Sequence, residues 1–343
     1  MDFCTLFDSR YIDRALVMFD SLRETCEDAV LYVVAFDRKC SDVLFDLSLS
    51  GVVVIPYEEF EDDVLRAAKN DRSPREFFWT CSGYCIRYVM QRFGLDACTC
   101  IDSDLYFYES VTSAINRFLD SGCDAAIISH RYSRHPENDY NARMYGNYCV
   151  QFNTFRNSAN GMAILNWWID RCLERCPENA TDGLFGDQKY LDDFSSRFDG
   201  VYVYEDFGLG VAPWNVDDYV QQDKLIVNRH TREQGKLLFY HFHSLDVSDD
   251  GSSNIRVFIR PGRHDRKLVE GLYRPYITRL IKKRRFLVER YGSFSGNAQS
   301  TFEKVHEGEL RMFMKSELNQ WFLIRKIWRY ALNKSKDYIN ITV

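Results

Sequence analysis

The chain has 343 residues, of which 45% are hydrophobic and 15% aromatic, and its formal net charge is −6. These values indicate a globular protein with a sizeable core, in one large domain or two. No apolar run reaches 18 residues, which excludes a membrane-spanning helix, and the acidic start at residues 1–7 is too short for a secretory signal. We therefore expect a cytoplasmic protein.

Charge divides the chain into two parts. Residues 256–343 contain 20 Lys and Arg against 8 Asp and Glu, whereas residues 1–255 contain 24 against 42. We expect the two parts to have different partners. The predicted domains are residues 1–253 and a basic, mainly helical region at residues 254–343.

The first part alternates strand and helix patterns, which is typical of a parallel sheet wound by helices. Strands are predicted at residues 3–7, 30–36, 52–55, 97–101, 124–129 and 148–155. Helices are predicted at residues 12–23, 40–47, 75–93 and 111–120, and from a cap at Asn157 or Ser158 to Cys176. Residues 56–71 are an acidic connector with a helical piece. Residues 130–147 are a polar loop, long enough to be a lid or an acceptor-binding loop.

Eleven cysteines are scattered without a paired Cys-x-x-Cys framework. Such usage fits a reducing compartment in which cysteines pack as small apolar side chains. Cys81 with Cys85, and Cys172 with Cys176, have the i, i+4 spacing from which a zinc site could start, but no second ligand pair at metal spacing lies nearby. We predict that both pairs belong to the core.

Two carboxylates one residue apart, Asp102 and Asp104, directly follow the predicted strand at residues 97–101. If the chain stays extended there, both side chains project to the same side, because strand side chains alternate. An Asp-x-Asp occurs often by chance in an acidic chain. Here, however, the pair lies beyond the carboxyl end of a strand, where open α/β sheets bind ligands. Two carboxylates together with phosphate oxygens suit Mg²⁺ or Mn²⁺, so this is a candidate metal site for chemistry on a diphosphate.

Three later segments add to this candidate site. Asp187 and Gln188 stand at the start of a predicted helix, and residues 208–215 are a Gly-rich aromatic turn. The predicted strand at residues 237–244 ends in His241 and His243. A neutral imidazole beside two carboxylates suits a third Mn²⁺ ligand, and a hydrogen-bonded structural histidine is the alternative.

Taken in order, these residues resemble a known family, the GT-A nucleotide-sugar glycosyltransferases, and within them the retaining enzymes of glycosyltransferase family 8 and their bacterial relatives. The resemblance covers about residues 1–250, and it implies that the predicted domain at residues 1–253 is a GT-A catalytic domain that binds a nucleotide-sugar. It implies an α/β fold of GT-A type, with a Rossmann-like mixed, mainly parallel sheet flanked by helices, here followed by a C-terminal helical basic extension. The motifs that carry it are residues 5–11, Arg87, residues 101–105, residues 185–188, residues 213–215 and residues 240–243.

The resemblance also implies roles for individual residues. Asp8 and Tyr11 would hold the nucleoside, Asp8 by accepting from the base and Tyr11 by stacking on it. Asp187 and Gln188 would be the catalytic pair that faces the donor sugar, and Arg87 would reach the sugar or the diphosphate. Thr5, Phe7 and Ser103 complete the implied nucleotide-sugar site.

The same resemblance implies a metal centre. Asp102 and Asp104 would bind the metal and the ribose, and His241, with His243 as the alternate, would be the third ligand. Two departures from the family pattern stand out. Ser244-Leu245-Asp246 follows His241, so the lysine expected at the diphosphate is not identified, and Cys149-Val150-Gln151 replaces the usual Asn-x-Gly. Both leave the identity of the sugar open.

The chemistry agrees with these implied roles. Cleavage of a sugar-phosphate bond develops negative charge on the diphosphate, which Mn²⁺ or Mg²⁺ stabilises. The expected reaction is transfer from a nucleotide-diphospho-sugar, a UDP-sugar by resemblance, to a saccharide or lipid-linked saccharide acceptor. Since Gln188 is a feeble nucleophile, retention with attack on the leaving-group face is the easier pathway. The alternatives are a metal-dependent phosphoesterase or nucleotidyltransferase, and a non-catalytic sugar-nucleotide-binding protein.

The basic region is predicted to contain helices at residues 267–291 and 307–334, separated by a Gly/Ser/Asn-rich breaker. Trp and Tyr beside Lys and Arg fit an interfacial helix on anionic lipid. Our hypothesis is a peripheral contact with the inner membrane face, and the alternative is a helical pair packed on the catalytic domain. No nucleic-acid-binding motif accompanies the charge, so we expect no nucleic acid partner.

Overall fold

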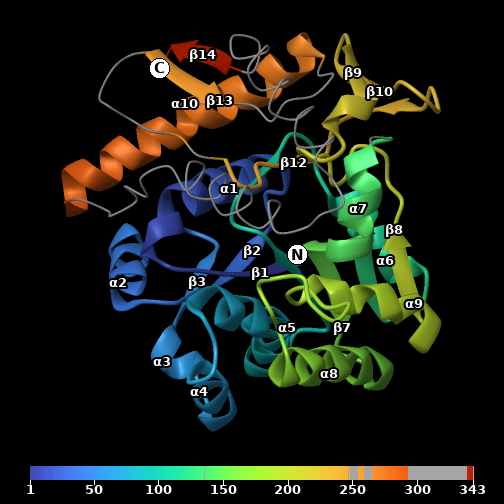
Figure 1. Cartoon of the computed structure of the whole chain (residues 1–343). Helices are drawn as coiled ribbons and strands as arrows, with labels where there is room; N and C mark the ends of the chain where they lie inside the picture. Colours follow the sequence, from blue (N-terminus) through green and yellow to red (C-terminus); the bar gives the residue numbers. More distant parts are fainter. Residues whose placement is uncertain (135, 246, 248–253, 259–264, 293–337, 343) are drawn as a thin grey trace, which may run out of the picture. The chain divides into compact units, whose positions relative to one another are not determined.

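The computed structural model describes the whole chain except residues 135, 246, 248–253, 259–264, 293–337 and 343 (Figure 1). The chain divides into two compact units, Met1–Phe242 and His243–Val343. The boundary predicted between residues 253 and 254 therefore falls inside the second unit.

The first unit is built on a seven-stranded sheet with the order β3-β2-β1-β4-β7-β6-β8. Every neighbouring pair is parallel except the two that involve β7, which runs antiparallel to β4 and β6. This confirms the predicted mixed, mainly parallel sheet. The strands are β1 (Asp2–Phe7), β2 (Val30–Ala35), β3 (Val52–Pro56), β4 (Ala97–Ile101), β6 (Ala125–Ser129), β7 (Tyr148–Arg156) and β8 (Val201–Tyr204).

Helices flank this sheet and connect its strands. They are α1 (Ile12–Thr25), α2 (Arg38–Leu47), α3 (Tyr57–Phe60), α4 (Asp63–Lys69), α5 (Pro74–Phe93), α6 (Thr112–Asp120), α7 (Pro136–Tyr145), α8 (Ala159–Glu174) and α9 (Phe194–Arg197). The start of α5 shows how sequence fixes a boundary, since Ser73 and Glu76 form a capping box and Pro74 occupies the first turn. The helix ends at Gly94, whose φ of 65° is left-handed.

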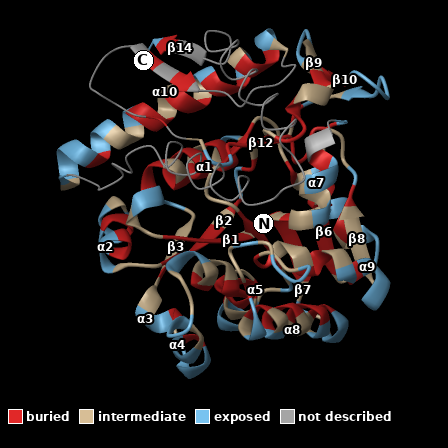
Figure 2. Ribbon diagram, viewed as in Figure 1, coloured by how far each residue is buried: buried red, intermediate tan, exposed pale blue. Residues whose placement is uncertain are grey.

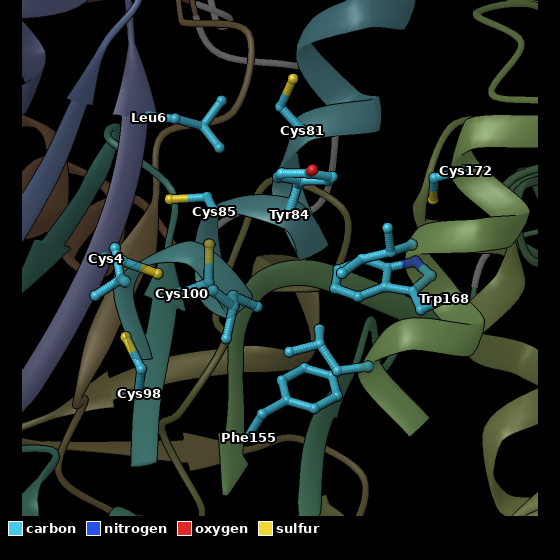
Figure 3. Packing of buried hydrophobic residues seen from close by; sticks show 14 of the residues in the cluster. Cys4, Leu6, Cys81, Tyr84, Cys85, Cys98, Cys100, Phe155, Trp168 and Cys172 are labelled. Atoms are coloured by element: carbon cyan, nitrogen blue, oxygen red, sulfur yellow. The ribbon is translucent and has the colours of Figure 1, made fainter. Parts of the chain in front are cut away.

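Cysteine side chains fill part of the core between β1, β4 and α5. Figure 3 shows Cys4, Cys85, Cys98 and Cys100 grouped there, with Trp168 of α8 and Phe155 of β7 nearby. All the cysteines are free, and all except Cys123 are buried. Burial holds the pKa of the Cys81 and Cys172 thiols well above the usual value, so both stay neutral. The prediction that Cys81/Cys85 and Cys172/Cys176 belong to the core is confirmed.

Burial follows the sheet. Figure 2 shows buried residues concentrated in the central strands, while exposed residues lie on the outer helices such as α2 and α4. Helices α5 and α8 lie side by side on one face of the sheet (Figure 1). Gly83 of α5 permits this close approach, because an added Cβ would lie 3.0 Å from both Ile169 and Trp168 of α8.

One prediction about the chain's path was wrong, and a second was right only in part. Helix α7 lies within residues 130–147, which were predicted to be a polar loop. Pro136 favours the first helical position, and good helix formers follow later in the helix at Ala142, Arg143 and Met144. The strand expected at residues 237–244 is the shorter β12 (Phe239–His241), which pairs with β5 (Leu105–Phe107) in a separate two-stranded sheet.

A further small sheet contains β9 (Tyr219–Gln222), β10 (Leu225–Asn228) and β11 (Gln234–Gly235).

In the second unit, β13 (Asn254–Phe258) pairs antiparallel with β14 (Tyr338–Thr342). Helix α10 (Arg266–Tyr291) confirms the predicted helix at residues 267–291, and Asp265 caps its N-terminus. The helix predicted at residues 307–334 lies outside the described residues. Among the helices that the structure describes, none has the length and apolar content needed to cross a membrane.

Candidate functional site

The two carboxylates that follow β4 lie in a turn. Asp102 donates its backbone N–H to the carbonyl of Gln151 in β7 (3.1 Å), and the backbone N–H of Leu105 lies 3.4 Å from the carbonyl of Asp102. The chain thus turns at residues 102–104 before β5 begins. The segment is therefore not extended, and the turn rather than strand alternation brings the side chains of Asp102 and Asp104 to one place.

Pairing between β5 and β12 brings His241 to the same turn. The antiparallel register sets His241 opposite Leu105, and the backbone N–H of Phe242 donates to the carbonyl of Asp104 (3.0 Å). As a result, Nε2 of His241 lies 3.0 Å from Oδ1 of Asp104 and 3.5 Å from Oδ2 of Asp102. The imidazole is 3% exposed, so it reaches the turn from inside the fold.

These three side chains fit a divalent cation. One ligand atom from each lies within 4.8 Å of the others, and no other such group occurs among the described residues. Adjacent ligands of an octahedral ion, bound at about 2.1 Å, are about 3 Å apart, which matches the separation of His241 from Asp104. Two carboxylates and one imidazole suit Mn²⁺ or Mg²⁺ with the remaining positions open to phosphate and water.

The local electrostatics also favour a cation. Burial raises the pKa of Asp102 to about 6, Asp104 adds to the rise, and His241 opposes it. Burial alone would lower the pKa of His241, but Asp104 and Asp102 hold it well above its usual value. A protonated His241 therefore supplies positive charge beside the two carboxylates. A divalent cation at the site would take over this role.

The candidate nucleoside residues lie at the end of β1. Asp8 caps the short 3-10 helix η1 (Ser9–Tyr11) by accepting from the backbone N–H of Arg10, and its carboxylate forms an ion pair with the Arg10 guanidinium. Tyr11 is 43% exposed. Partial burial and the charge of Asp104 raise the pKa of Tyr11, so its hydroxyl group is within electrostatic range of the carboxylate turn. Thr5 and Phe7 are buried within β1.

Asp187 and Gln188 lie at the start of the 3-10 helix η2 (Gln188–Asp193), as predicted. Asp187 is 2% exposed, and its Oδ2 atom has no hydrogen-bond partner. Burial raises the pKa of this carboxyl group to about 7, against the lowering effect of Ser82. Gln188 donates from Nε2 to the carbonyl of Tyr145 at the end of α7 (2.7 Å), which links the candidate catalytic residues to this helix.

The remaining predicted residues have other surroundings. Arg87 donates to Oδ1 of Asn166 in α8 (3.0 Å) and lies over the ring of Tyr84 (4.2 Å). Ser103 lies in the turn between the two carboxylates. His243 is exposed and begins the second unit, and the ligand group contains His241 instead.

Sequence reasoning missed two contacts of His241. Gln151 of β7 accepts at Oε1 from Nδ1 of the imidazole (2.7 Å), and the Trp214 ring packs edge-on against it (5.5 Å between centroids). Gln151 is one of several polar residues in β7, together with Asn153 and Thr154, so the sequence carried no signal for the first. The Gly-rich aromatic turn at residues 208–215 was a signal for the second.

No family model matches the chain. Solved structures that resemble it include mouse xyloside xylosyltransferase 1 in its apo form (13% identity, 71% of this chain and 97% of that one, TM-score 0.42). Another is the galactosyltransferase LgtC in complex with donor and acceptor sugar analogues (12% identity, 71% and 87%, TM-score 0.42). Similarity of this degree carries no functional assignment.

Among curated sequences, the chain is 27% identical to the uncharacterized protein YfnF of Bacillus subtilis (strain 168), over 85% of this chain and 97% of the relative. It is 26% identical to the uncharacterized protein YfnD of the same organism, over 81% and 88%. We therefore infer the function from the residues of the site.

Proposed function

We propose that the protein is a metal-dependent glycosyltransferase of GT-A type, which transfers a sugar from a nucleotide-diphospho-sugar to a saccharide or lipid-linked saccharide. The observation that carries this proposal is the group formed by Asp102, Asp104 and His241 at the carboxyl end of β4. The group lies at the carboxyl end of a strand in a mainly parallel sheet, and this is where such folds bind nucleotides.

Asp102, Asp104 and His241 would hold Mn²⁺ or Mg²⁺. When bound, the cation supplies positive charge that stabilises the diphosphate as it leaves. Tyr11, which lies near Asp104, supplies an exposed ring on which a base can stack, and Asp8 at the start of η1 supplies an acceptor for the base. The proposed donor is a UDP-sugar, as in the family that the sequence resembles.

Asp187 and Gln188 are the proposed residues at the donor sugar. The buried carboxyl of Asp187 has an unpartnered oxygen, which a sugar hydroxyl would satisfy. The Gln188 amide is held by the Tyr145 carbonyl, so it is fixed in orientation but is a poor nucleophile. These properties support retention, with the acceptor hydroxyl attacking from the side of the leaving diphosphate while Asp187 orients the sugar.

A membrane contact through α10 is the second part of the proposal. Its C-terminal half exposes Phe286 and Val288, by 40% and 45%, next to the exposed side chains of Lys282 and Arg285. Exposed apolar side chains flanked by basic ones suit a surface of anionic lipid. We expect Phe286→Ser combined with Lys282→Glu to weaken co-sedimentation with anionic liposomes, and equal binding by the two proteins would contradict the contact.

A thermal-shift panel of UDP-, GDP- and ADP-sugars with and without Mn²⁺ tests the donor assignment, because binding to the folded state raises the melting temperature. We expect a shift with a UDP-sugar that depends on Mn²⁺. Product analysis then separates the alternatives. Released UDP with a glycosylated acceptor supports the transferase, free phosphate or pyrophosphate supports a phosphoesterase or nucleotidyltransferase, and binding without turnover supports a sugar-nucleotide-binding protein.

A further inference from the structure

Gln151 is a fully buried amide in the middle of β7. Its Oε1 atom lies 2.7 Å from Nδ1 of His241, and its backbone carbonyl accepts from the N–H of Asp102. One residue thus contacts two members of the candidate metal centre, one through its side chain and one through its backbone.

The sheet accounts for this position. Strand β7 runs antiparallel to β4, with Phe152 opposite Ile101, so the residue before Phe152 lies beside the carboxylate turn. His241 comes from the other direction, through the β5–β12 pair. Gln151 therefore joins the large sheet to the small one at the point where the ligands meet.

The hydrogen bond between Gln151 and His241 determines which nitrogen of the imidazole carries the proton. A neutral histidine binds a metal through one nitrogen while the other carries the proton, and the hydrogen bond made by the second nitrogen selects the tautomer. An amide oxygen only accepts, so an acceptor at Nδ1 requires the proton there and leaves the Nε2 lone pair facing Asp102 and Asp104.

Gln151 also suits the charge of the site. A carboxylate at this position would add a third negative charge, whereas a neutral amide leaves the two carboxylates matched to one divalent cation. The Cys149 thiol also contacts His241, but burial raises its pKa and a neutral thiol is a weak acceptor. The edge-on ring of Trp214 restricts rotation of the imidazole further.

We infer that Gln151 is a positioning residue of the proposed metal centre, which holds His241 with Nδ1 protonated and Nε2 directed at the cation. The inference rests on the proposed function, because it requires Asp102, Asp104 and His241 to bind a metal. It goes beyond that function by assigning the orientation of the third ligand to a residue that touches neither the cation nor the substrate.

Mn²⁺ binding to the full chain, measured by electron paramagnetic resonance without any donor, tests the inference. Gln151→Met keeps the volume and removes the acceptor, and we expect its Mn²⁺ affinity to fall about 10- to 100-fold. Gln151→Glu restores an acceptor oxygen, and we expect it to bind Mn²⁺ at least as tightly as the wild type. Recovery in the Glu variant distinguishes hydrogen bonding from space filling.

Thr154→Val is the matched control. Thr154 lies further along β7, where its hydroxyl lies within hydrogen-bond distance of Thr99 and Tyr204, so its loss perturbs the same strand without removing a partner of His241. We expect a lower melting temperature with unchanged Mn²⁺ affinity. Unchanged affinity in Gln151→Met, or equal weakening in the Met and Glu variants, would overturn the inference alone. A wild-type chain that binds no Mn²⁺ would overturn the metal centre and the inference together.

Discussion

Nε2 of His241 lies 3.0 Å from Oδ1 of Asp104, although the two residues come from distant parts of the chain. The β5–β12 register produces this distance, because it sets His241 opposite Leu105, the neighbour of Asp104. The position of the third candidate ligand thus depends on backbone pairing, and it can be disturbed without changing any ligand.

Replacement of Asp104 by Asn tests the candidate ligands directly. Asp104→Asn removes one negative charge and a carboxylate ligand while keeping the shape. Loss of a contact outside the ligand shell lowers metal affinity about 10- to 100-fold. We expect loss of this ligand to lower Mn²⁺ affinity and sugar transfer by more than that. Calorimetry with Mn²⁺ and a transfer assay would measure both. Unchanged turnover in a folded variant would refute the site.

The ring of Tyr11 is predicted to stack on the donor base. Base–aromatic stacking contributes about 1–3 kcal/mol per base, so Tyr11→Ala should weaken UDP binding in the presence of Mn²⁺ by roughly 5- to 150-fold. Tyr11→Phe keeps the ring and should bind UDP like the wild type. Isothermal titration would compare them, and equal losses in both variants would argue against stacking.

Asp187 gives stability a defined pH dependence. Its pKa of about 7 in the folded chain is raised above the ordinary value of 3.8. The folded chain therefore holds a proton that the unfolded chain releases, and the free energy of unfolding falls as the pH rises through the window between these two values. Asp187→Asn removes this pH dependence. Between pH 4 and pH 8, the free energy of unfolding of the metal-free variant should therefore rise relative to that of the wild type by a few kcal/mol, on the order of the shift in the Asp187 pKa.

Urea denaturation of both proteins across this range would measure that difference. Other groups titrate in the same interval, but they are common to both proteins and cancel in the comparison. A constant difference between variant and wild type would contradict the raised pKa. In the transfer assay, Asp187→Asn should lose activity while its Mn²⁺ affinity changes little.

Gly208 is predicted to be essential for the course of β12. Its φ is +80°, and an added Cβ would lie 2.0 Å from the carbonyl oxygen of Lys236. Gly208→Ala should therefore lose stability from both the left-handed conformation and the clash. Gly94→Ala is the control, since Gly94 has a φ of +65° with no atom within 4 Å of an added Cβ, and it should cost only about 1–2 kcal/mol.

A second measurement separates the two glycine variants. The carbonyl of Gly208 accepts from the N–H of Leu238, just before β12. A shift of this segment would displace His241, so Gly208→Ala should also lose Mn²⁺ affinity and Gly94→Ala should not. Equal stability and equal Mn²⁺ binding in the two variants would contradict the prediction.

Local patterns were enough to predict most of the sheet and its helices. The strand before Asp102 is short and apolar, and capping residues such as Ser73 and Gly94 mark helix ends in the sequence itself. The candidate ligands Asp102, Asp104 and His241 were also predicted, because each follows or ends a strand pattern. Whether they bind metal stays a prediction.

Long-range pairing could not be predicted in this way. A hydrogen bond to Gln151 holds the start of the turn at residues 102–104, and the Gln151–His241 contact depends on the order of strands in two sheets. No local pattern encodes either. Helix α7 was missed for a different reason, since its polar residues resemble a loop in composition and carry no apolar periodicity.

The place of β12 in the chain has a consequence for biosynthesis. It is the last strand of the first unit, while its partner β5 and the carboxylate turn are made much earlier. A ribosome must therefore complete almost the whole unit before His241 can meet Asp104. Until then, the nascent chain carries two carboxylates without their imidazole. If the group binds Mn²⁺ as proposed, tight Mn²⁺ binding would mark a unit that has finished folding.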